Sequence, residues 1–408
     1  RLDAAIKLQR ALREFRVRGV TTNKSFLLNV LRHPDFLHKH VTTSFIGQNP
    51  DLLEKTQSKD RAQKILQFVG DINVNGPEES LGAVGDPPSS VNPTIPHLED
   101  NTASQRKLRE IYTSQGPEAF AKAVRAHQGL LVTDTTWRDA HQSLLATRMR
   151  TEDIVKAAPA TSAALGNQVF SLEMWGGATF DVSMRFLKEC PWERLEALRE
   201  AVPDVPFQML LRGANAVGYT SYPDSLVYAF CEQAVKSGID IFRVFDSLNY
   251  IENMELGIKA ANKAGGFVES AICYTGDVTD TSKNNKYGLD YYVNYARQLV
   301  ELGTHGLAVK DMAGLLTPKA STMLIGALRE AFPDTPIHVH THDTAGAAVA
   351  SMLAAAEAGA DIVDCAVDSM SGMTSQPSMG AIVASTKGTP LETGMSLSAL
   401  EVLNEYWE

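Results

Sequence analysis

From residue 129 onward, short apolar runs alternate with longer amphipathic stretches. The runs are rich in β-branched and aromatic residues and have the length of a buried strand, whereas stretches such as 192–202 have the three- and four-residue spacing of a surface helix. Eight runs are expected to form strands: residues 129–136, 169–176, 206–213, 239–246, 267–276, 306–312, 336–343 and 361–370. Strands that alternate with helices indicate βαβ units and a parallel sheet.

Eight such units over about 250 residues match a (β/α)₈ TIM barrel in number and size. An open, doubly wound α/β sheet is the alternative architecture. No glycine-rich dinucleotide fingerprint follows any of the expected strands, so the barrel is favoured.

The N-terminal part of the chain has a different pattern. Two helices are expected with a short strand between them, then a helical stretch, an extended linker rich in Pro, Gly and Ser, and a helical pair. These segments are, in order, residues 4–15 and 23–36 with the strand at 16–20, residues 50–69, residues 74–101, and residues 103–127.

Composition narrows the possible functions. The 408 residues are 44% hydrophobic and carry a net charge of −10, so a general nucleic-acid binder is not expected. No run of about 18 apolar residues occurs, so we expect no membrane span. Because the chain begins with Arg1 rather than methionine, we expect a piece of a longer protein.

In a TIM barrel, catalytic residues lie where the strands end and the following loops begin. Polar residues occupy these positions after five of the expected strands: Arg138, Asp139 and Gln142; Asp181; Arg212 and Tyr219; Lys310 and Asp311; His340, His342 and Asp343. Side chains alternate along a strand, which puts His340 and His342 on one face with His338 one step deeper. Two imidazoles with Asp139 predict a Zn²⁺ or Mn²⁺ site, and a hydrogen-bonded pair of core histidines is the alternative.

Two cationic residues at this rim have open interpretations. Lys310 ends a buried strand, where an isolated charge is costly, so it is either paired with Asp311 or Asp343, or neutral and chemically altered. Arg212 precedes a glycine and suits bidentate binding of a small carboxylate. Its alternative is a structural pair with Asp181 or Asp246.

Seven motifs within residues 129–380 resemble the carboxyltransferase domain of the pyruvate carboxylase family, a metal-containing barrel. They occur in the family's order: DTTWRDAHQSLLATR, WGGATFD, PFQMLLRGAN, IFRVFDSLN, VKDMAGLL, HTHD and SGMTSQPS. Residues 11–36 resemble the tail of its biotin carboxylase domain. The resemblance implies four parts: 1–45 as this tail, 46–128 as the linker and allosteric (tetramerisation) region, 129–390 as the carboxyltransferase TIM barrel, and 391–408 as the start of a helical funnel.

The resemblance also implies an activity, which is transfer of a carboxyl group from carboxybiotin to pyruvate to give oxaloacetate. This is one half-reaction of an ATP- and bicarbonate-dependent ligase of anaplerosis and gluconeogenesis. Asp139, His340, His342 and a carbamylated Lys310 would hold the metal, and Arg212 would bind the pyruvate carboxylate. The remaining implied residues line the pocket shared by pyruvate and the biotin ring: Gln142, Asp181 and Tyr219.

Further features of the family enter as expectations. Biotin would arrive on a carrier domain, since no biotinyl Met-Lys-Met occurs in this sequence. Acetyl-CoA would act as an activator and contact Arg16, Arg18 and Arg61. The full protein would be a homotetramer. It would be located in the mitochondrial matrix or, alternatively, in the cytoplasm. A funnel threonine that relays a proton is expected beyond residue 408, so the chain alone should bind metal and pyruvate but transfer carboxyl groups poorly.

Three alternatives remain. A biotin-dependent oxaloacetate decarboxylase or transcarboxylase subunit shares the barrel motifs, but such subunits lack the tail resembled by residues 11–36. A lyase of the hydroxymethylglutaryl-CoA type shares the Arg-Asp and His-x-His-Asp patterns, but lacks the runs at 175–179 and 310–314. A catalytically silent assembly module is a different class, and barrels of that kind usually lose metal ligands.

Overall fold

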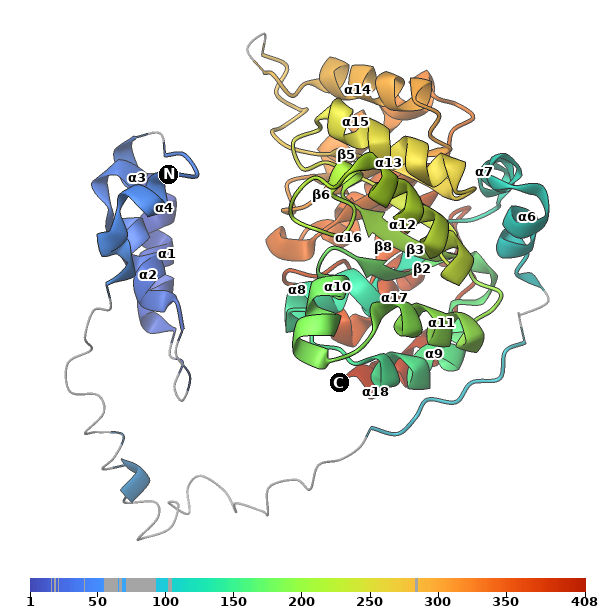
Figure 1. The fold of residues 1–408 in the computed structure, drawn as a ribbon, viewed down its shortest axis with the longest axis horizontal. Coiled ribbons are helices and arrows are strands. Elements are labelled where there is room, and N and C mark those ends of the chain that lie inside the picture. Colours follow the sequence, from blue (N-terminus) through green and yellow to red (C-terminus); the bar gives the residue numbers. More distant parts are fainter. Residues whose placement is uncertain are drawn as a thin grey trace. The chain divides into compact units, whose positions relative to one another are not determined.

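The computed structural model describes residues 1–15, 17, 20, 22–39, 41–54, 65, 68–70, 93–101, 105–282 and 285–408. The chain divides into two compact units, Arg1–Val91 and Asn92–Glu408, and each is considered by itself (Figure 1).

Short helices make up the described part of the N-terminal unit. They are α1 (Leu2–Glu14), α2 (Lys24–Arg32), α3 (Pro34–His38), α4 (Phe45–Gln48) and the 3₁₀ turn η1 (Pro50–Leu53). The single helix expected at 23–36 is wrong, because His33 is extended and divides it. A residue before proline is disfavoured in the helical conformation, and Pro34 then begins α3. The strand expected at 16–20 and the helix at 50–69 lie mostly outside the described residues.

Eight parallel strands close into a barrel in the second unit, in the order β1 to β8 with β8 beside β1. The strands are β1 (Leu131–Asp134), β2 (Val169–Gly176), β3 (Phe207–Leu211), β4 (Ile241–Val244), β5 (Phe267–Cys273), β6 (Gly306–Asp311), β7 (Ile337–Thr341) and β8 (Ile362–Cys365). Each lies within one of the eight expected runs, so the TIM-barrel prediction is confirmed. Every strand residue is buried, since the strands are covered outside by helices and inside by one another's side chains.

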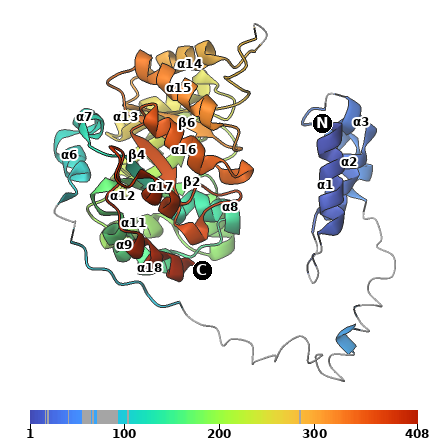
Figure 2. The same cartoon turned by 180° about the vertical axis from the view of Figure 1, so that it is seen from behind.

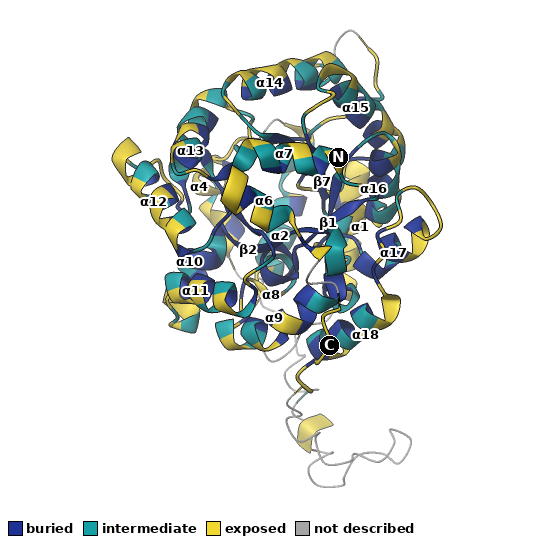
Figure 3. Ribbon diagram, turned by 90° about the vertical axis from the view of Figure 1, so that its right-hand side faces the viewer, coloured by how far each residue is buried: buried dark blue, intermediate teal, exposed yellow. Residues whose placement is uncertain are grey.

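The larger helices surround the strands in both views of the ribbon (Figures 1 and 2). They are α9 (Thr151–Leu165), α11 (Pro191–Ala201), α12 (Asp224–Ser237), α13 (Ile251–Lys263), α14 (Leu289–Glu301), α15 (Pro318–Ala331), α16 (Ala348–Glu357), α17 (Met379–Thr386) and α18 (Leu397–Trp407). In α14 the buried residues Tyr292, Tyr295, Ala296 and Leu299 recur at helical spacing. Figure 3 shows this division, with buried inner faces and exposed outer faces. Within the described residues, no helix combines the length and the apolar character needed to cross a membrane.

The expected helical pair is present as α6 (Leu108–Gln115) and α7 (Pro117–Ala126), and it packs against the N-terminal ends of the strands. We call the aromatic side chains gathered there the aromatic cap: Tyr112, Phe120, Phe170 and Phe267. Phe120 is fully buried, and its ring centroid lies 4.9 Å from that of Phe267 and 5.6 Å from that of Phe170. The aromatic cap therefore covers the end of the barrel opposite the predicted site.

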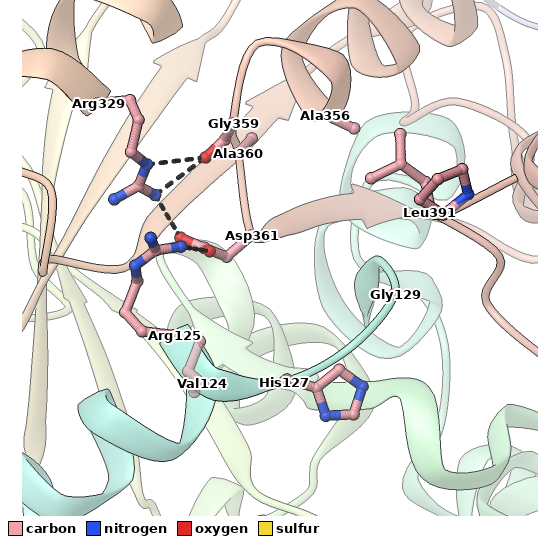
Figure 4. A pocket seen from close by; sticks show the side chains of 11 residues that line it. Val124, Arg125, His127, Gly129, Arg329, Ala356, Gly359, Ala360, Asp361 and Leu391 are labelled. Carbon is pink, nitrogen blue, oxygen red and sulfur yellow. Dashed lines mark hydrogen bonds and ion pairs between the residues drawn. The ribbon is translucent and has the colours of Figure 1, made fainter.

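Ion pairs hold α7 and α15 at the same end (Figure 4). Asp361, which precedes β8, pairs with Arg125 of α7 and accepts a hydrogen bond of 2.6 Å from Arg329 of α15. Arg329 also donates to the carbonyl oxygen of Gly359 at 2.9 Å. These contacts join α7, α15 and the start of β8 around the hollow that they line.

Candidate active site

The register of β6 and β7 brings Lys310 and His340 to the same level of the barrel. The two residues are direct partners across the parallel pair, and both side chains are buried. Their chain neighbours point the other way, as alternation requires: the Thr341 hydroxyl donates to Asp311 at 2.8 Å. Lys310 therefore faces the barrel interior, whereas Asp311 faces the surrounding helices.

Four predicted ligands meet at the C-terminal mouth of the barrel. Asp139 Oδ2 lies 3.3 Å from His340 Nε2 and 3.5 Å from His342 Nε2. The two Nε2 atoms are 3.2 Å apart, and Lys310 Nζ is 2.9 Å from His340 Nε2. Atoms bound tetrahedrally to a zinc ion at about 2.1 Å would be separated by about 3.4 Å, close to the spacing of the Asp139 oxygen and the two histidine nitrogens. The spacing and chemistry of these three donors thus fit a divalent metal.

The outer ring nitrogens of both histidines are already engaged. His340 Nδ1 lies 2.5 Å from Asp364 Oδ2, and His342 Nδ1 lies 2.6 Å from the carbonyl oxygen of Thr374. Both partners are acceptors, so each Nδ1 is placed to donate to its partner while each Nε2 faces the shared centre. The two histidines do not form an isolated pair, because Asp139 and Lys310 lie beside His340 Nε2 as well.

Electrostatics favour the ligand-ready forms of these side chains. Burial lowers the pKa of His342 to about 4, which keeps the imidazole neutral near pH 7. Burial would raise the pKa of Asp139, but Arg138 and His340 hold it well below its ordinary value. Burial likewise lowers the pKa of the Lys310 ammonium, although Asp139 opposes this shift.

Two residues that were not predicted as ligands fix the Asp139 carboxylate: Arg138, expected only as a polar residue at the strand end, and Gln376. Arg138 donates to Oδ1 at 2.7 Å and pairs with the buried Glu173 of β2. Gln376 donates to Oδ2 at 2.8 Å. Gln376 belongs to the SGMTSQPS motif, but an uncharged side chain in a loop gave no signal of contact with Asp139.

The proposed structural partners of Lys310 are otherwise engaged. Asp311 accepts hydrogen bonds from the backbone N–H groups of the loop that follows β6, the shortest of them 2.8 Å from Leu316. Asp343 accepts from the N–H group of Ala348 at 2.9 Å. Among the ion pairs of the described residues, none joins Lys310 to either carboxylate.

Arg212 lies beside Gln142 and Gly177 at the mouth of the barrel. A Cβ atom built on Gly177 would come within 2.7 Å of Arg212 Nη2 and 3.6 Å of Gln142 Oε1. Arg212 donates to the carbonyl oxygen of Gly218 at 3.1 Å and lies over the ring of Tyr219 at 5.1 Å. Gln142 Oε1 is buried and has no hydrogen-bond partner in the described part of the chain. These groups form a polar cluster at the mouth of the barrel.

Arg212 does not pair with the carboxylates considered as structural partners. Asp181 instead accepts a hydrogen bond from Arg185 at 3.2 Å, and Asp246 accepts from Asn253 at 2.8 Å. The guanidinium of Arg212 thus has no carboxylate partner among the described residues. The ring of Tyr219 is 67% exposed, and Asp181 lies near the surface with Arg185. Arg16, Arg18 and Arg61, predicted to contact an activator, lie outside the described residues.

Two family models match parts of the chain. The biotin carboxylase C-terminal domain matches residues 1–48, and the HMGL-like family matches residues 259–406. The second match includes β6 and β7 with Lys310, His340 and His342.

Curated proteins match nearly the whole chain. Pyruvate carboxylase 1 of Caenorhabditis elegans is 58% identical over 406 residues, which is 100% of this chain and 34% of that protein. The mitochondrial pyruvate carboxylase of Mus musculus is 59% identical over 405 residues, covering 99% of this chain and 34% of the relative. The chain therefore spans about a third of the length of the curated relatives it matches.

Solved structures agree with these relatives. A complete multifunctional pyruvate carboxylase from Rhizobium etli has a TM-score of 0.76 and 48% identity, covering 100% of this chain and 37% of that one. The carboxyl transferase domain of the same enzyme with pyruvate and biocytin also has a TM-score of 0.76, with 49% identity over 86% of this chain and 58% of that one. Sequence identity and fold lead to the same conclusion, that the chain belongs to the pyruvate carboxylase family.

Proposed function

We propose that this chain carries the site that transfers a carboxyl group from carboxybiotin to pyruvate, giving oxaloacetate. The observation that carries the proposal is the convergence of Asp139, His340 and His342 on one point, with both outer histidine nitrogens engaged elsewhere. The guanidinium of Arg212, which lies beside Gln142 at the same mouth of the barrel and has no carboxylate partner among the described residues, supports a carboxylate substrate. The Rhizobium etli domain bound to pyruvate and biocytin supports this choice of substrates.

The protein's own residues have three tasks under this proposal. Arg212 binds the pyruvate carboxylate through two parallel N–H groups, and the Gln142 amide orients the bound molecule. Asp139, His340, His342 and Lys310 hold a zinc or manganese ion. When bound, this ion would polarise the keto oxygen and favour the enol. The pyruvate methyl group loses a proton and gains the carboxyl carbon, while the biotin nitrogen loses that carbon and gains a proton.

We further infer that Lys310 reacts with CO₂ to form a carbamate. The amine is buried and its pKa is lowered, so the neutral, nucleophilic form is accessible. A carbamate would convert a cation beside His340 into an anionic oxygen ligand. Incubation with ¹³C-bicarbonate should produce a carbamate ¹³C signal that is absent from Lys310→Gln. A spectrum without this signal in the metal-loaded chain would contradict the carbamate.

The wider setting remains a proposal drawn from the relatives. Residues 1–45 would be the tail of a biotin carboxylase domain, 46–128 an allosteric region, 129–390 the carboxyltransferase barrel, and 391–408 the start of a helical funnel.

A Rhizobium etli relative was solved with the allosteric activator acetyl coenzyme-A, which supports acetyl-CoA as an activator here. A biotin carrier domain and a homotetramer complete the assembly. Relatives from mouse and human named mitochondrial support the mitochondrial matrix, with the cytoplasm as the alternative.

A biotin-dependent decarboxylase or transcarboxylase subunit is the second candidate. The match of residues 1–48 to a biotin carboxylase C-terminal domain favours the carboxylase, because those subunits have no such domain ahead of the barrel. A silent assembly module is disfavoured because all four ligand positions are filled and arranged around one point.

The test is pyruvate binding next to the metal, measured on the chain loaded with Mn²⁺. Paramagnetic Mn²⁺ in the site should shorten the NMR relaxation times of the pyruvate methyl protons, and removal of Mn²⁺ by a chelator should restore them. If the Mn²⁺-loaded chain leaves these relaxation times unchanged at millimolar pyruvate, the proposal is wrong and the assembly module is favoured. Binding can be tested in this way even if carboxyl transfer by the chain alone is slow.

Gly177→Ala is expected to weaken pyruvate binding in this assay by tenfold or more. The new methyl group would lie 2.7 Å from Arg212 Nη2, so the guanidinium must leave its present position. The matched control is Gly346→Ala, which also adds a methyl group at positive φ but meets no atom within 4 Å. Equal binding by the two variants would show that the position of Arg212 beside Gly177 is not needed.

A further inference from the structure

Four titratable side chains form a closed ring inside the barrel, and all are at most 1% exposed. We call them the buried ring: Arg243 of β4, Glu269 of β5, His338 of β7 and Asp364 of β8. Arg243 contacts Glu269 and Asp364, each at 2.5 Å. His338 contacts the same two carboxylates, at 2.7 Å and 2.6 Å. Each acid thus lies between two nitrogen-bearing partners, which is the arrangement that buried charges require.

One member of the buried ring also reaches the candidate metal centre. Asp364 Oδ2, which accepts from Arg243, lies 2.5 Å from His340 Nδ1. Glu269 has the same two partners in the ring, but none of its described contacts is with a candidate metal ligand. Asp364 is therefore the link between the ring and the ligand set.

We propose that Asp364 is a positioning residue that sets the orientation, tautomer and ligand strength of His340. This inference rests on the metal site of the proposed function. The Asp364 carboxylate keeps the proton on Nδ1, so the lone pair of Nε2 faces Asp139, and its negative charge makes the imidazole a stronger donor to a metal. Arg243 and His338 fix both oxygens of the carboxylate, so it cannot rotate away from His340.

The geometry explains why an amide is a poor substitute at this position. An asparagine has one acceptor oxygen, and its NH₂ group would face an N–H donor of Arg243 or His338. With the NH₂ group toward His340 Nδ1, the amide favours the tautomer with its proton on Nε2. With the oxygen toward His340, the NH₂ group faces His338 and the negative charge that strengthens the imidazole is lost.

The experiment compares Co²⁺ binding by the full 408-residue chain as wild type, Asp364→Asn and Glu269→Gln. For Asp364→Asn we expect a loss in Co²⁺ affinity of about 10–100-fold and a shifted d–d absorption band. Glu269→Gln removes one negative charge from the same ring without touching His340. Its affinity should stay within about threefold of wild type and its absorption band should not shift, even if thermal stability falls.

The outcomes separate this inference from the proposed function. If the wild-type chain binds no Co²⁺, the metal site of the proposed function fails and the inference fails with it. If wild type binds but Asp364→Asn binds equally well, only the inference is overturned. Equal losses in both variants would also overturn it, because the ring would then act through stability alone. If Asp364→Asn does not fold, Asp364→Glu is the second variant, because it keeps the negative charge but displaces the carboxylate. Unchanged Co²⁺ affinity and an unshifted absorption band in Asp364→Glu would overturn the inference.

Discussion

His340→Ala should leave the purified chain almost free of metal, whereas the unaltered chain should retain about one zinc or manganese ion per site. His340 Nε2 lies within 3.3 Å of three other candidate donor atoms, from Asp139, His342 and Lys310. Mutating a residue that hydrogen-bonds to a metal ligand typically lowers metal affinity by about 10–100-fold. Removal of His340 itself should lower the metal affinity by more than this. Elemental mass spectrometry of the two proteins measures the effect directly.

His305→Ala is the matched control for this experiment. His305 precedes β6 at the opposite end of the barrel, where its Nδ1 accepts a hydrogen bond of 3.0 Å from Val268. The same deletion of an imidazole there should leave the metal content unchanged. Metal retained by His340→Ala, or lost equally from both variants, would contradict the assignment of His340 as a ligand.

Arg212→Gln is expected to raise the dissociation constant of pyruvate by about 10–100-fold, because a charged hydrogen-bond partner typically contributes about 1.5–3 kcal/mol. Among the described residues, Arg212 has no carboxylate partner of its own, so its charge is available to a ligand. Relaxation of pyruvate protons by Mn²⁺ in the site gives the dissociation constant. Metal content should not change, which separates loss of the substrate contact from loss of the metal.

Arg185→Gln removes a guanidinium from the same face of the barrel and serves as control. Arg185 is exposed and its partner is Asp181, at 3.2 Å. Exposed pairs of this kind contribute little, so pyruvate binding should be nearly unaffected. Equal weakening in both variants would indicate a general electrostatic effect rather than direct contact with Arg212.

The barrel could be predicted from the sequence because its signal is repeated eight times. Each strand is buried on both faces and therefore appears as a short apolar run, and each run is followed by a helix-sized segment. The His-x-His pair could be predicted for a related reason, since alternation along a strand fixes which side chains share a face. The same rule, applied to Lys310 and Asp311, already separates them onto opposite faces and disfavours their pairing.

The supporting residues could not be predicted because their partners are distant in the chain. Asp364 and Arg243 are charged residues within apolar runs, and their contact joins strands separated by 121 residues. Gln376 reaches Asp139 across 237 residues from a loop without regular structure. Strand order and register decide these contacts, and a single sequence shows only that such charges need partners. The break in the helix at His33 could have been predicted, because Pro34 follows it in the sequence and proline acts locally on the residue before it.

In the described part of the chain, the aromatic cap closes the base of the barrel. Phe120, Phe170 and Phe267 pack there against one another, so the candidate ligands at the opposite end are not reached through the base. Under the proposed function, pyruvate and the biotin-bearing arm would both approach the ligand residues from this end of the barrel. A bound arm would then cover the same mouth through which pyruvate enters and oxaloacetate leaves.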